Sequence, residues 1–121
     1  MSRDLVYVDG GAGLAAVSQI STQLVTAPHA PVKFTAQVAD SSGVELSWIN
    51  GSSNEQEFLI ERAVKNGKHV SDFAPIAEVN RGVDTYTDAT TQSGITYLYR
   101  IAAINPIATN YSHRAASVTL P

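Results

Sequence analysis

The chain has 121 residues, of which 44% are hydrophobic and 16% charged, so it has enough apolar material for one folded domain and too little charge for a disordered chain. Its net charge of −3 offers no basic surplus for a phosphate backbone, which argues against nucleic acid as a partner. Cysteine is absent, which excludes disulfides, and no apolar run approaches the ~20 residues of a membrane span.

The first 27 residues differ from the rest of the chain. They are rich in Gly, Ala, Ser and Thr and contain one short apolar stretch, Leu5–Val8. We interpret residues 1–27 as a linker or N-terminal extension. Either Leu5–Val8 or Gln19–Val25 has the β-branched content of a strand that adds to a sheet edge. We also expect the chain to be a segment of a longer protein.

From residue 28 onward, apolar and polar residues alternate in short segments. Clusters of Gly, Asn, Asp and Ser separate these segments, and Asn66-Gly67 is a strong signal for a tight turn. Seven segments with this two-residue period predict an antiparallel sandwich or barrel. The seven expected strands are 32–38, 44–48, 57–64, 72–79, 85–88, 95–105 and 113–120.

Two aromatic residues are expected to be structural. Trp48 is the only tryptophan and stands at the inward end of its strand, so we expect it in the core. Tyr97 follows Gly94 by three residues at the start of the sixth strand. We expect its ring to fill the core and its hydroxyl to bond the backbone just upstream, because a buried hydroxyl needs a partner.

Arg62 breaks the alternation, because its parity places it on the inward side of the third strand. We expect its stem to cover Trp48 or Phe58 and its head to pair with Glu55 or Asp88, as a third structural residue. The functional alternative for Arg62 is an anion-binding site.

Two expectations concern the surface of the sandwich. Arg100 points outward, where Glu57 or Glu61 would form an exposed ion pair with it, and such pairs contribute little to stability. Pro75 marks the strand 72–79 as a sheet edge and protects that edge against pairing with a second copy. We therefore expect the isolated domain to be a monomer.

Four motifs, in the right order and spacing, resemble the fibronectin type III domain over residues 28–121. They are a Leu-x-Trp on the second strand, an aromatic-x-Ile on the third, a Gly-x-x-Tyr before the sixth, and the run 54–62, which looks like the variety common in large secreted bacterial proteins. Ser93 departs from the pattern, because many members have proline there. The matching residues are Leu46 and Trp48, Phe58 and Ile60, and Gly94 and Tyr97.

The resemblance implies an all-β, immunoglobulin-like sandwich of seven strands in two antiparallel sheets, three facing four. It implies no catalytic residue, so we expect a non-catalytic module of a larger secreted or cell-surface protein. Such a module acts as a spacer or as a protein–protein interaction domain, and its partners are neighbouring domains of the same polypeptide or another protein. The alternative is a carbohydrate-binding accessory domain of a secreted enzyme, although the aromatics outside the expected core, Tyr7, Phe73 and Tyr111, are scattered in the sequence.

The residues themselves predict no catalytic, cofactor-binding or metal site. His29, His69 and His113 lack the spacing of a metal site, and no calcium loop is present. The sequence also contains no Gly-x-Ser-x-Gly motif and no glycine-rich phosphate loop. No enzymatic activity is therefore expected.

Two loops are the expected binding region. Residues 49–56 and 105–112 both follow strands that run the same way, so they emerge at the same end of the sandwich, and loops on a rigid scaffold are common recognition sites. Ile107 and Tyr111 are the expected main contacts. The predicted binding residues are Asn50, Ser52, Asn54, Ile107, Asn110 and Tyr111.

Overall fold

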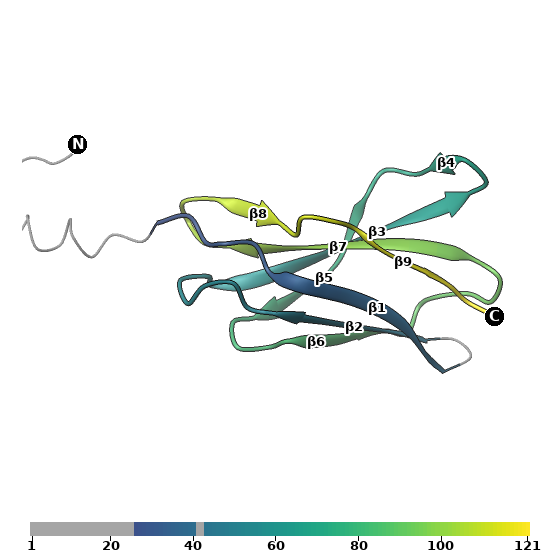
Figure 1. Ribbon diagram of the computed structural model, residues 1–121, viewed down its shortest axis with the longest axis horizontal. Helices are drawn as coiled ribbons and strands as arrows, with labels where there is room; N and C mark the ends of the chain where they lie inside the picture. Colours follow the sequence, from purple (N-terminus) through teal and green to yellow (C-terminus); the bar gives the residue numbers. More distant parts are fainter. Residues whose placement is uncertain (1–25, 41–42) are drawn as a thin grey trace, which may run out of the picture.

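The computed structural model describes residues 26–40 and 43–121, which form two antiparallel β-sheets without a helix (Figure 1). The described part therefore contains no helix suited to crossing a membrane. The smaller sheet has the order β1–β2–β6, and β3 and β7 form the centre of the larger sheet. The strands are β1 (Val32–Asp40), β2 (Gly43–Ile49), β3 (Glu57–Asn66), β4 (His69–Val70), β5 (Ala74–Asn80), β6 (Thr85–Asp88), β7 (Thr96–Ile104), β8 (Thr109–Tyr111) and β9 (Ala116–Thr119).

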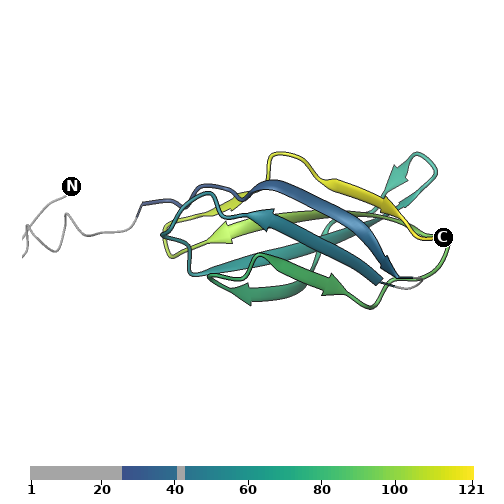
Figure 2. The same ribbon diagram turned by 60° about the horizontal axis from the view of Figure 1, so that its bottom comes forward.

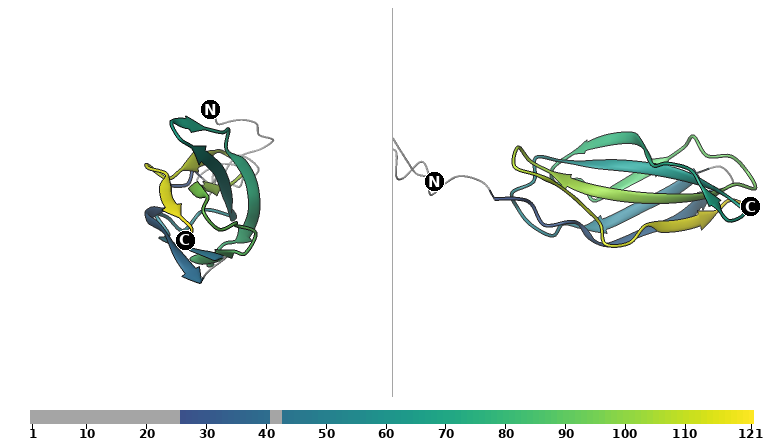
Figure 3. Two further views of the ribbon diagram at one scale, coloured as in Figure 1. Left: turned by 90° about the vertical axis from the view of Figure 1, so that its right-hand side faces the viewer. Right: turned by 90° about the horizontal axis from the view of Figure 1, so that it is seen from above.

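The larger sheet is four strands wide. β4 and β5 both pair with β3 on the side away from β7, while β8 and β9 both pair with β7 on the side away from β3. The predicted arrangement of three strands facing four is therefore confirmed. Figures 2 and 3 show the two layers stacked face to face, and the described chain begins and ends at opposite ends of the long axis.

The described residues form nine strands rather than the predicted seven. Asn66-Gly67 makes the expected tight turn, with Gly67 at φ 63°, and the chain after it folds back as the extra strand β4. The predicted last strand, 113–120, is shortened to β9, and the other extra strand, β8, lies within the predicted loop 105–112. The chain leaves β7 between them, and Ser112 alone donates its backbone N–H to Ile101 O at 2.6 Å.

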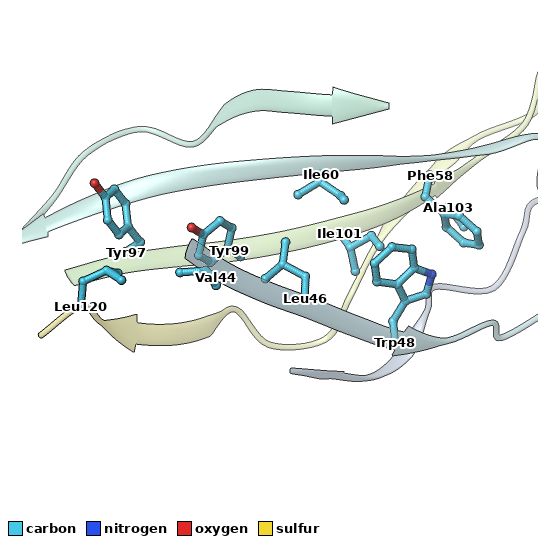
Figure 4. Packing of buried hydrophobic residues seen from close by; sticks show 10 residues of the cluster. All are labelled: Val44, Leu46, Trp48, Phe58, Ile60, Tyr97, Tyr99, Ile101, Ala103 and Leu120. Carbon is cyan, nitrogen blue, oxygen red and sulfur yellow. The ribbon is translucent and has the colours of Figure 1, made fainter. Parts of the chain in front are cut away.

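The core lies between the two sheets, where inward-facing residues of both layers meet (Figure 4). Trp48 is 4% exposed and packs against Phe34 and Phe58, with ring centroids 6.4 and 5.6 Å apart. The predicted core position of Trp48 is thus confirmed. The buried cluster comprises Val44, Leu46, Trp48, Phe58, Ile60, Tyr97, Tyr99, Ile101, Ala103 and Leu120.

Tyr97 makes the predicted bond to the backbone upstream. Its ring is 4% exposed, and its hydroxyl oxygen accepts a hydrogen bond from Gln92 N–H at 2.9 Å. The turn between these two residues contains Gly94 at φ 78°, a left-handed conformation that favours glycine. The hydroxyl therefore fixes the corner that leads into β7.

We expect Tyr97→Phe to lower the free energy of unfolding by about 0.5–1.5 kcal/mol, because it removes one intramolecular hydrogen bond and leaves the Gln92 N–H without it. Urea denaturation measures the change. Tyr86→Phe is the matched control, because the described residues give the Tyr86 hydroxyl no hydrogen bond. Equal losses in the two variants would contradict a role for the Tyr97 hydroxyl in the corner.

Candidate functional site

Arg62 lies in a polar cluster that joins the two sheets. Its Nη1 is 2.8 Å from Asp88 Oδ2, and Tyr99 Oη donates to the same oxygen at 2.7 Å. The other oxygen, Asp88 Oδ1, accepts from Thr90 N–H at 3.0 Å and from Thr90 Oγ1 at 2.6 Å. Asp88 is one of the two expected partners of Arg62, and Arg62 covers the ring of Tyr97 rather than Trp48 or Phe58, with Cζ 4.9 Å from the centroid.

Hydrogen bonding keeps the buried Asp88 carboxylate ionised. Burial alone would raise the pKa of Asp88, but the hydrogen bonds from Thr90, Tyr99 and Arg62 outweigh it, so the pKa lies below its ordinary value. Burial and the adjacent Asp88 charge raise the pKa of Tyr99, which stays a neutral donor. Hydrogen bonds connect Arg62, Asp88, Thr90 and Tyr99, so the cluster links the two sheets. Because the Arg62 guanidinium is already bonded to Asp88, it has little capacity to bind an external anion.

The two predicted loops meet at the end of the sandwich where the described chain begins. We call this end the N-terminal pole, formed by residues 26–31, 49–56 and 105–112. Asn105 Nδ2 donates to Asn54 O at 3.1 Å, which links the two loops directly. The prediction that they emerge at the same end is confirmed.

Side chains of both loops bind the backbone of the incoming segment 26–29. Asn54 Nδ2 donates to Thr26 O at 2.8 Å, and Asn110 Nδ2 donates to Pro28 O at 2.6 Å. Ser52 Oγ accepts from His29 N–H at 3.2 Å. Three of the six predicted binding residues thus hold this chain's own backbone at the N-terminal pole.

The remaining three predicted residues differ in their surroundings. Asn50 Nδ2 donates to the buried Glu55 carboxylate at 2.7 Å, so it stabilises the loop from within. Ile107 and Tyr111 are exposed, by 56% and 37%. Binding of a partner by any of these residues stays a prediction.

Asn105 is the residue at the N-terminal pole that sequence reasoning missed. It is 5% exposed, and its Nδ2 also donates to Thr26 O at 2.7 Å. Its Oδ1 accepts from the N–H groups of Ile107 and Ala108 at 2.9 and 3.2 Å. The dipeptide Asn105-Pro106 was the available signal, because asparagine before proline favours a turn.

A second cluster lies on the outer face of the larger sheet. The Arg100 guanidinium is held between two rings, with Cζ 4.5 Å from the centroid of Phe73 and 4.2 Å from that of Tyr111. Its Nε is 2.6 Å from Glu61 Oε1, and Tyr111 Oη donates to Glu61 Oε2 at 3.4 Å. We call these four residues the arginine stack.

The arginine stack corrects the expectation of a fully exposed ion pair. Glu61 is one of the two expected partners of Arg100, but it is only 7% exposed, because the stacked side chains cover it. Ala63 and Ala102 on the same face are 1% and 0% exposed. Phe73 and Tyr111, scattered in the sequence, meet here around one guanidinium.

The described residues contain no group of three or more His, Asp or Glu side chains placed to hold a metal ion. A scan against models of protein families found no match, and a search of curated proteins found none either. The search of solved structures did find matches. An Fn3-like protein from Clostridium thermocellum superposes with a TM-score of 0.63 at 22% identity, over 79% of this chain and 96% of that chain.

The chain has the fibronectin type III fold. Longer proteins with the same fold also match. Pectate lyase Pel3 from Pectobacterium carotovorum matches with a TM-score of 0.59 at 22% identity, over 69% of this chain and 26% of that chain. The twitchin kinase region from C. elegans matches with a TM-score of 0.62 at 23% identity, over 79% of this chain and 17% of that chain. In these two proteins the fibronectin type III fold occupies a minor part of a longer chain.

We expect Asp88→Asn to lower the stability at neutral pH by about 1–3 kcal/mol, because Arg62 and Tyr99 lose a charged acceptor. The pKa of Asp88 is lower in the folded chain than in the unfolded chain, so its contribution is present above about pH 4 and is lost as the pH falls through the folded value. The variant should therefore lose less stability than the parent below about pH 4. Denaturation at several pH values measures both effects. Asp72→Asn removes an exposed carboxylate and is the control. If Asp88→Asn and the parent lose the same stability at acid pH, the lowered pKa of Asp88 is contradicted.

We expect Asn105→Ala to lower the free energy of unfolding by about 1–3 kcal/mol, because partly buried carbonyl and N–H groups lose their partners. Asn80→Ala is the control, since the described residues give the exposed Asn80 side chain no hydrogen bond. Urea denaturation compares the two. A loss in Asn105→Ala no larger than in Asn80→Ala would show that the bonds at the N-terminal pole do not support the fold.

Proposed function

We propose that this chain is a non-catalytic module that acts as a spacer between neighbouring domains of a larger secreted or cell-surface protein. The observation that carries the proposal is the position of the chain ends. The described chain begins at the N-terminal pole and ends at the opposite end of the long axis (Figures 1 and 2). Domains joined through such ends follow one another in line.

Both ends of the described chain are bonded to the body of the domain. At the N-terminal pole, Asn54 and Asn105 bind Thr26 O. At the opposite end, Leu120 is 1% exposed, its N–H donates to Ile95 O at 3.0 Å, and its carbonyl accepts from Gly94 N–H at 3.1 Å. Ser93 Oγ also donates to Pro121 O. Force applied to the ends therefore passes into the sheets.

Two further observations support a module of this kind. Pectate lyase Pel3 and the twitchin kinase region contain the same fold within longer chains. The free edge of β5 bears Pro75 and Glu78, and both residue types discourage pairing with another strand, which supports a monomer. The resemblance to modules of secreted bacterial proteins supports a secreted or surface location.

The arginine stack is the surface that best suits a protein partner. Arginine and tyrosine are over-represented among residues that dominate binding energy, and the stack holds both in one conformation. A carbohydrate-binding role has less support, because the guanidinium occupies one face of both Phe73 and Tyr111. Sugars would need such faces for stacking.

Force spectroscopy on the full chain, pulled through its two termini, tests the spacer function. We expect one resolved unfolding event with a gain in contour length of roughly 300 Å, because β1 and β9 are loaded along their length and the whole domain opens at once. Phe73→Ala with Tyr111→Ala should leave the unfolding force unchanged if the stack serves only contact with a partner. Extension without a resolved force peak would contradict a spacer that carries load.

Fractionation of the source cells with an antibody against this chain tests the proposed location. We expect the antigen in the medium or on the cell surface, as part of a polypeptide longer than 121 residues. Recovery of the antigen only from the cytosol would contradict the proposed location, and the force measurement would still test the spacer function independently.

A further inference from the structure

At the seam between the two sheets, β1 runs beside β9 and the segment that precedes it (Figure 3). A cleft of about 290 Å³ lies between these two parts of the chain. We call it the seam cleft. One wall is Pro31–Phe34 and the other is Ser112–Arg114. Within the described residues β1 pairs only with β2, and β9 lies beside its other edge without pairing with it.

The strand structure is irregular on both walls of the seam cleft. Lys33 has φ 53°, a left-handed conformation that residues other than glycine rarely adopt, and the register between β1 and β2 shifts between Val32 and Thr35. On the other wall, residues 112–115 lie outside β8 and β9. The two edges therefore separate here, and backbone strain of this kind is often found at ligand-binding positions.

The seam cleft combines an apolar wall with unpaired positive charges. Val32 is 48% exposed, and Phe34 is half-buried beside it. Lys33 and Arg114 are exposed, and the described residues provide neither with an ion-pair partner, in contrast to Arg62 and Arg100. An extended segment with apolar side chains and acidic flanks would complement this lining.

The chain outside the described residues contains one segment of this chemistry. Residues 1–25 include only two carboxylates, Asp4 and Asp9, and these flank the apolar stretch Leu5–Val8. Leu, Val and Tyr at these positions suit an extended strand. Residues 10–25 separate Asp9 from Thr26, and a chain of that length spans at most about 55 Å, which is ample for a return from Thr26 to the seam cleft nearby.

We infer that residues 4–9 of this chain dock in its own seam cleft. Alternate apolar side chains of Leu5–Val8 cover Val32 and Phe34, and Asp4 and Asp9, at the two ends of the segment, lie near Lys33 and Arg114. The docked segment lies between the two walls of the seam cleft, Pro31–Phe34 and Ser112–Arg114. This would make the N-terminal extension a part of the folded module, in agreement with the added edge strand that the sequence suggests.

Paramagnetic relaxation on the full chain tests the docking, since the absence of cysteine allows a spin label at the single site Ser2→Cys. We expect the amide signals of Lys33, His113 and Arg114 to be lost in the labelled chain, and the signal of Val70 on β4 to persist. The pair Lys33→Glu with Arg114→Glu should restore the lost signals. The control is the pair Lys65→Glu with Lys68→Glu, which changes the net charge by the same amount at the β3–β4 hairpin. In this control the amide signals of Lys33, His113 and Arg114 should still be lost.

Two results would overturn the inference. Signals at the seam cleft that survive as well as that of Val70 would show that the segment does not dock there. The second test mixes isotope-labelled chain that carries no spin label with spin-labelled chain that carries no isotope. Loss of the seam-cleft signals in this mixture would show that the segment binds a second copy. Neither result depends on whether the module acts as a spacer.

Discussion

The buried carboxylate of Asp88 joins the two sheets, and the core depends on its remaining paired. It lies on β6 of the smaller sheet and accepts hydrogen bonds from Arg62 on β3 and Tyr99 on β7 of the larger sheet. An unpaired charge at this depth would cost several kcal/mol, a large part of the total stability of a domain. Arg62, Tyr99 and Thr90 satisfy both oxygens of Asp88, so an arginine that points inward is compatible with an apolar core. At this end of the core, these hydrogen bonds link the two sheets.

The opposite end of the core is closed by different means. Trp48 fills the space between the sheets there, and the loops above it are held by asparagine side chains that bind backbone groups of segment 26–29. Asn105 is central to this arrangement, because one buried side chain serves the incoming chain, the loop after β2 and its own turn. Amide groups suit this role, since each carries donors and an acceptor without the cost of burying a charge.

Much of the fold follows from local sequence. Alternation of apolar and polar residues identifies the strands and their inward faces, and Asn66-Gly67 identifies a tight turn, because both signals arise from the two-residue period of a strand and from glycine's freedom at positive φ. The same alternation predicted the core positions of Trp48 and Tyr97. It also predicted that Arg62 points inward and needs an acidic partner, for which Asp88 and Glu55 were the candidates. Strand β8, within the predicted loop 105–112, could not be stated in advance, because it forms only through its pairing with β7.

The sequence alone determined the class of fold, the core parity and the end at which the two long loops meet, because short-range periodicity and strand direction decide these. Only the tertiary structure decided which side chains meet. Phe73 and Tyr111 lie far apart along the chain, and pairing of β5 with β3, of β3 with β7 and of β7 with β8 brings both rings to Arg100. Likewise, Lys33 and Arg114 become walls of one cleft only because β1 runs beside β9. Such contacts join residues that are distant in the sequence, and no local pattern specifies which strands will be neighbours.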